Sequence, residues 1–149
     1  MGTSPNSSQP TNDRWVVYDY EVGMWRDMCN LLCVNNPIFG NLCLSIKNAV
    51  VESAVLHTRI LVDILLSRGK NLDDINLSNL VPSLQSTNVE KLRNAYGDGK
   101  QESTPCWEFN KMLAHATSHR SRSYDYSGAL NSLRPLIDAL VAEIATRRN

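Results

Sequence analysis

The chain of 149 residues has no excess of charge of either sign, because 15 Lys and Arg side chains balance 15 Asp and Glu side chains. A protein without net positive charge lacks the overall field that drives nonspecific adhesion to nucleic acid or to anionic lipid. Either kind of partner would therefore have to bind through a local patch.

The sequence also lacks an uninterrupted apolar run that could span a membrane. The longest helix-like apolar stretch, residues 42–66, is interrupted by five ionisable side chains, which a lipid-spanning segment rarely tolerates: Lys47, Glu52, His57, Arg59 and Asp63. The first residues, MGTSPNSSQPTNDR, have neither the basic nor the apolar region of a secretory signal. We therefore expect a soluble, cytoplasmic protein with no membrane partner.

Short motifs for covalent or nucleotide chemistry are missing as well. No phosphate-cradling glycine loop, serine nucleophile motif, nucleotide fingerprint or CxxC pair occurs. The four cysteines are expected to be buried free thiols rather than a disulfide framework: Cys29, Cys33, Cys43 and Cys106. Cys29 and Cys33 have a spacing that could hold a metal, but their apolar neighbours favour core packing.

What the sequence does have is helical periodicity, with no alternating strand pattern to compete with it. Apolar residues recur at spacings of three and four, which predicts an amphipathic helix wherever they do. Helices are predicted over residues 15–33, 41–68, 105–119 and 127–147, with room for a short helix at 88–96. Together they predict an all-α fold, a four- to five-helix up-and-down bundle with a long irregular connection before the fourth helix.

Turn and cap residues mark the predicted boundaries. Gly69 stands where a C-terminal cap of the long helix would lie. Thr104 followed by Pro105 is a plausible start of the fourth helix, and Pro135 is expected to kink the last one. Residues 1–13 are almost entirely polar, so we expect a disordered leader that can be removed without loss of stability, and a single domain at 14–149.

The segment FNKMLAHATSHR, residues 109–120, carries two of the three histidines in the chain. With 100° per residue, its apolar side chains gather on one arc that must face the core. His115 and His119 then flank that arc. Boundary histidines often do no more than satisfy a buried carbonyl or carboxylate, so a structural role and a reactive one both remain open.

Three motifs occur in order along the chain: VLHTRILVDIL at 55–65, LDDI at 72–75 and FNKMLAHATSHR at 109–120. In this combination the chain resembles an uncharacterised family of small bacterial helical proteins over residues 50–145. The resemblance implies an all-α bundle with a shared polar cluster. It selects His57, Arg59, Asp73, Asp74, Asn110, Lys111, His115 and Arg120.

More distantly, the chain resembles the HEPN superfamily of helical domains, many of which dimerise and act as ribonucleases. Their signature is an arginine, a polar residue and, a few positions later, a histidine. Here Phe109 stands where the arginine would be, so only Asn110 and His115 match. A histidine could transfer protons in 2′-hydroxyl attack, and Arg120 or Arg59 could stabilise the phosphorane charge. This resemblance implies a homodimer and RNA as partners.

A metal site is the alternative hypothesis. His115 and His119 have the i, i+4 spacing that can place two imidazoles on one divalent ion such as Zn or Ni, and His57 could be the third ligand. This division of histidines resembles the DinB-like metal-binding four-helix bundles. The leading hypothesis needs no cofactor, and a third possibility is a non-catalytic interaction protein.

Whichever use applies, we expect one connected polar cluster between the long helix and the fourth helix, formed by His57, Arg59, Asn110, His115 and Arg120. His57 and Arg59 lie in a segment that should be packed on more than one side, so they need oxygen partners. Asp63, Asp73 and Asp74 are the expected carboxylates.

Overall fold

The structure, a computed structural model, describes residues 11–33, 35–71, 73–114 and 124–148. These residues form seven helices and contain no strand, which confirms the predicted all-α class. Three helices are long: α1 (Thr11–Leu31), α3 (Leu44–Leu65) and α7 (Tyr126–Arg147). The shorter helices are α2 (Pro37–Gly40), α4 (Leu77–Leu80), α5 (Thr87–Tyr96) and α6 (Pro105–Ala114).

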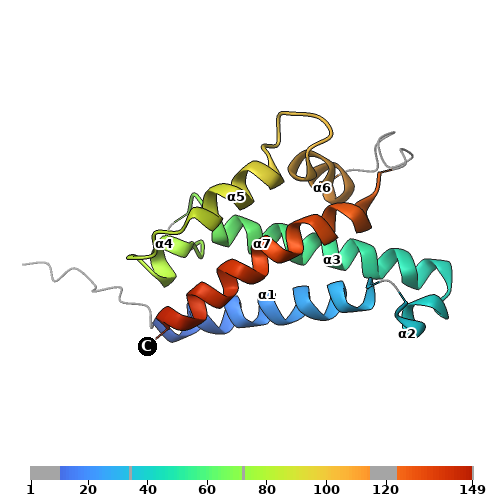
Figure 1. Cartoon of the computed structure of the whole chain (residues 1–149), viewed down its shortest axis with the longest axis horizontal. Helices are drawn as coiled ribbons and strands as arrows, with labels where there is room; N and C mark the ends of the chain where they lie inside the picture. The colour runs from blue at the N-terminus through green and yellow to red at the C-terminus, as the bar shows by residue number, and fades with distance from the viewer. Residues whose placement is uncertain (1–10, 34, 72, 115–123, 149) are drawn as a thin grey trace, which may run out of the picture.

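The three long helices build the body of the bundle (Figure 1). Helices α1 and α3 pack along one another, α7 packs against α3 and α1, and α5 and α6 cover the remaining sides of α7 and α3. The core contains a large aromatic side chain from each of α1, α5 and α6, namely Trp25, Tyr96 and Phe109, all almost fully buried. None of the described helices is long and apolar enough to cross a membrane.

Helix α1 follows its predicted period, with Tyr18, Val22, Trp25 and Cys29 all buried. It begins at Thr11, however, so the predicted leader of residues 1–13 extends three residues into a helix. Residues 1–10 lie outside the described part of the chain. Removal of residues 11–13 would shorten α1, and the prediction of a harmless truncation can apply only to the segment before it.

The caps of α5, α6 and α7 explain where these helices start. Ser86 Oγ accepts a hydrogen bond from the Asn88 amide at 3.1 Å, and Thr104 Oγ1 accepts one from the Trp107 amide at 3.3 Å. Asp125 does the same for the Gly128 amide at 2.8 Å. Each oxygen satisfies a backbone donor that has no partner within its helix. Thr104 and Pro105 therefore start α6 as the sequence predicts.

The end of α3 differs from the prediction. The helix stops at Leu65, and the residue that takes a left-handed conformation is Ser67 (φ 52°) rather than Gly69. Gly69 is needed for a different reason, because a Cβ placed there would lie 2.4 Å from the Cβ of Asp74. The glycine lets residue 69 approach Asp74 in the loop that follows the helix. At the other end, residues 41–43 precede the helix, which starts at Leu44 after α2.

The cysteines are only partly as predicted. All four are free thiols, and Cys29 and Cys106 are buried. Burial raises the pKa of the Cys29 thiol to about 11, which keeps it protonated near neutral pH. Cys33 is half-buried, and Cys43 is exposed at the residue before α3, so the expected burial is wrong for Cys43.

Candidate functional site

His57 is buried and hydrogen-bonded to Glu21, with 2.7 Å between Nδ1 and Oε2. Glu21 is also buried and comes from α1, so this contact joins α1 to α3. The edge of the Tyr20 ring lies against the same imidazole, with 6.1 Å between ring centroids. Asp63, Asp73 and Asp74 were the expected carboxylates, and for His57 that expectation is wrong.

Arg59 lies two residues from His57 on the same helix, and such positions point to different sides of a helix. Its guanidinium is near Asp63, one turn further on. Burial raises the pKa of Asp63, and the Arg59 and Arg68 guanidinium groups oppose that shift. Within the described residues no hydrogen bond or ion pair connects Arg59 with His57.

Asn110, in the middle of α6, belongs to a separate group. Its amide nitrogen lies 3.8 Å from the Cys106 sulfur, which also accepts a hydrogen bond from Arg68 Nη1 at 3.3 Å. Arg68 Nη2 donates to the Gly97 carbonyl at 2.8 Å, and the guanidinium stacks over the Tyr96 ring. Arg68 therefore ties the end of α3 to α5 and α6, a role that the sequence motifs did not indicate.

The remaining predicted site residues, His115, His119 and Arg120, lie outside the described residues. The structure thus places His57, Arg59 and Asn110 in three different surroundings, and the single polar cluster stays a prediction as a whole. The same holds for the metal alternative, because two of its three histidines are among these residues. His57 uses Nδ1 for Glu21, an arrangement that also occurs where the other ring nitrogen binds a metal.

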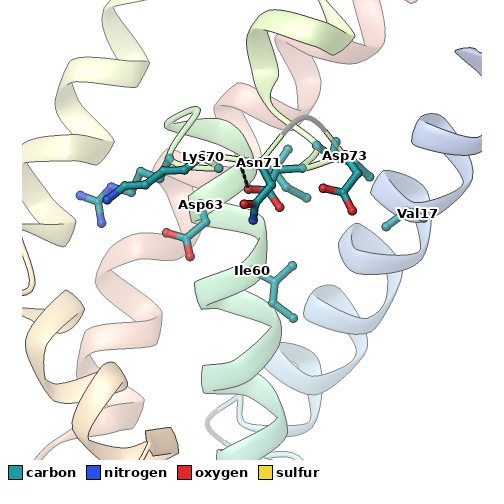
Figure 2. Close-up of a pocket in the computed structure, with 11 residues that line it drawn as sticks. Val17, Ile60, Asp63, Lys70, Asn71 and Asp73 are labelled. Atoms are coloured by element: carbon teal, nitrogen blue, oxygen red, sulfur yellow. Dashed lines mark hydrogen bonds between the residues drawn. The ribbon is translucent and has the colours of Figure 1, made fainter. Parts of the chain in front are cut away.

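A cleft of about 560 Å³ opens beside the end of α3 (Figure 2). Its walls come from α1, from the last two turns of α3 and from the loop that follows: Val17, Ile60, Asp63, Ile64, Arg68, Gly69, Lys70, Asn71, Asp73, Asp74 and Ile75. This volume is within the range of pockets that hold small molecules. The LDDI motif thus contributes both of its aspartates to the cleft.

Side chain to backbone hydrogen bonds fix the loop that forms the roof of the cleft. The Asn76 amide accepts from the Gly69 backbone nitrogen at 3.0 Å and donates to the Gly69 carbonyl at 3.3 Å. Asp74 accepts from the Asn71 amide at 2.7 Å, which lowers the pKa of this carboxyl. These hydrogen bonds lie within the loop itself and fix the backbone that lines the cleft.

A second feature is an apolar surface on the outer side of the α1–α3 pair. We call it the α1–α3 face, and it consists of Val16, Val17, Tyr20, Leu56 and Ile60. Val16 and Tyr20 remain 62% and 57% exposed. Val17 and Ile60 both line the cleft, and Tyr20 contacts His57, which follows Leu56. The two helices therefore present one continuous surface.

Comparison with protein-family models, with curated proteins and with solved structures gave no match. The α1–α3 face and the cleft are therefore the features from which we infer a function.

Proposed function

We propose that this protein is a non-catalytic interaction module that forms a homodimer through the α1–α3 face. The observation that carries the proposal is the exposure of large apolar side chains on adjacent turns of two helices that already pack together. Such contiguous apolar surface is uncommon on a monomer unless it is used for binding. Isolated exposed apolar residues, by contrast, are normal.

A second copy of the chain is the occupant that the charge balance favours. The chain has no formal net charge, so two copies do not repel one another as strongly charged proteins do. A twofold dimer would place the α1–α3 pair of one copy on that of the other, which makes a four-helix arrangement with a new apolar layer. Twofold dimers are also the commonest symmetric assemblies of soluble proteins.

Sedimentation of the full chain tests the proposal. We expect a mass twice that of the 16.7 kDa protomer at micromolar concentrations. Tyr20→Glu should give a monomer with an unchanged helical circular dichroism spectrum, because the side chain is exposed in the protomer. The matched control is Leu44→Glu, which changes an even more exposed apolar residue outside the face and should leave the dimer intact. A monomeric wild type, or equal effects of both substitutions, would contradict the proposal.

The RNA-directed hypothesis depends on His115 and Arg120, which lie outside the described part of the chain, so it is tested separately. If His115 acts on RNA, His115→Ala should abolish cleavage of a single-stranded RNA and leave thermal stability nearly unchanged. If it is structural, the same substitution should lower stability by about 1–3 kcal/mol without an effect on RNA. Metal analysis of untagged protein addresses the alternative, because a three-histidine site should retain Zn or Ni stoichiometrically.

A further inference from the structure

The cleft beside the end of α3 has a charge arrangement that is not symmetric along its length. Figure 2 shows Asp63 and Lys70 to one side of Asn71, and Asp73 and Val17 to the other. The two sides differ in which charges are balanced.

On the Asp63 side of the cleft, each basic side chain either has hydrogen-bond partners or lies on the same side as a carboxylate. Arg68 donates to the Cys106 sulfur and to the Gly97 carbonyl and stacks on Tyr96, so its guanidinium is held toward α5 and α6. Lys70 lies on the same side as the Asp63 carboxylate. An anionic ligand would therefore meet a carboxylate beside each available cation.

At the other side, Asp73 has neither a hydrogen bond nor an ion pair with any described residue. Asp74, the second aspartate of the motif, differs because its carboxylate accepts a hydrogen bond from the backbone amide of Asn71. Below Asp73 the floor of the cleft is apolar, since Val17 and Ile60 point toward one another from α1 and α3 (Figure 2). Ile64 and Ile75 also line the cleft. A carboxylate without a partner among the described residues thus lies beside an aliphatic surface.

We propose that the cleft binds a small organic cation, an ammonium or guanidinium group attached to an apolar body. The cationic group would pair with Asp73, and the apolar body would lie on Val17, Ile60 and Ile75. A carboxylate that pairs with a cation makes a charge-assisted hydrogen bond, and the aliphatic floor contributes burial of apolar area. The cleft is formed within one chain, but Val17 and Ile60 also belong to the α1–α3 face, so the cation and a second copy of the chain would compete for these two side chains.

The test uses three probes of nearly equal shape: 2-phenylethylammonium, the neutral 2-phenylethanol and the anionic 3-phenylpropanoate. Each is titrated into the full chain and followed by amide resonances in nuclear magnetic resonance spectra. We expect saturable shifts at Gly69, Asn71 and Asp73 with the ammonium probe. The neutral probe should bind about tenfold more weakly, as the loss of one charge-assisted hydrogen bond implies, and the anion more weakly still.

Two substitutions locate the binding. Asp73→Asn should lower the affinity for the ammonium probe by about tenfold, to the affinity that the alcohol has. Asp27→Asn is the matched control, because Asp27 is exposed on α1 and does not line the cleft, and it should leave the affinity unchanged. Equal affinity for all three probes, shifts confined to another part of the molecule, or an unaltered affinity in Asp73→Asn would each overturn the inference.

Discussion

The two halves of α3 differ in how well the rest of the chain covers them. Seven of the nine buried residues of this helix lie in its second half, residues 55–65, whereas the first half has only Val50 and Ala54. Leu44 and Ile46 are apolar yet exposed, as is Ile38 in the neighbouring α2. Apolar composition is thus similar along the helix, while packing is concentrated at its carboxyl half, which also carries the cleft.

The difference arises from the partners of each half. Arg68 anchors the carboxyl end to α5 and α6, and Glu21 anchors the middle to α1. The amino end is preceded by a single-turn helix without buried residues. The carboxyl half thus has polar contacts with α1, α5 and α6, whereas Lys47 in the amino half donates to the Gly40 carbonyl of the short α2. The carboxyl half is the part of α3 that positions the candidate sites.

Truncation of one leucine in each half of α3 should have very different effects on stability. Leu61 is fully buried, so Leu61→Ala should lower the free energy of unfolding by about 3–5 kcal/mol through lost burial and a cavity. Leu44 is 72% exposed, and Leu44→Ala should change it by less than about 0.5 kcal/mol. Urea denaturation measures both values. Similar values for the two variants would remove the distinction between the halves.

An intermediate effect is expected at the contact between α1 and α3. His57→Leu should lower the free energy of unfolding by about 2–3 kcal/mol, because the Glu21 carboxylate is left buried without its partner. The double variant Glu21→Leu/His57→Leu should regain most of that loss, since two apolar side chains of suitable size can replace a buried polar pair. If the double variant is the less stable of the two, the pair itself contributes the stability.

Smaller effects on stability, of opposite sign, are expected at two glycines. Gly69→Ala should lower the free energy of unfolding by about 1–2 kcal/mol, because the new methyl group meets Asp74 and the loop must shift. Gly23→Ala should raise it by about 0.5–1 kcal/mol, since Gly23 lies within α1 with open space around it. Thermal unfolding of both variants checks the opposite signs. A neutral Gly69→Ala would indicate that the roof of the cleft is not fixed.

The sequence was sufficient for the longer helices, but it did not predict the single-turn helices α2 and α4 or the contacts between helices. Periodicity placed α1, α3, α5 and α7 to within a few residues, because each helix buries one stripe of apolar side chains. The C-terminal cap of α3 was placed wrongly at Gly69. A glycine signals either a left-handed residue or a close approach, and only the packing of Asp74 distinguishes the two.

The partner of His57 shows a similar limit. Glu21 is 36 residues earlier in the chain, and no local spacing connects the two. One signal was present, because Glu21 lies three residues after Tyr18 and four before Trp25, on the stripe of α1 predicted to be buried. A carboxylate on such a stripe needs a partner. Asp73 and Asp74 were selected by resemblance, but their different roles depend on the loop, which a single sequence does not specify.

The last turn of the chain has a practical consequence for experiments on this molecule. The Arg148 guanidinium donates two hydrogen bonds to the Asp19 carboxylate, at 2.6 and 2.9 Å, and lies over the Trp15 ring. The C-terminus therefore lies beside the beginning of α1 (Figure 1), the same stretch of helix that supplies Val17 to the cleft. Trp15 and Asp19 lie on the side of α1 opposite Val17, so a fluorophore or a surface tether attached at this end would be close to α1 but on the side away from the cleft. Attachment at Cys43, exposed at the far end of α3, offers the distant alternative.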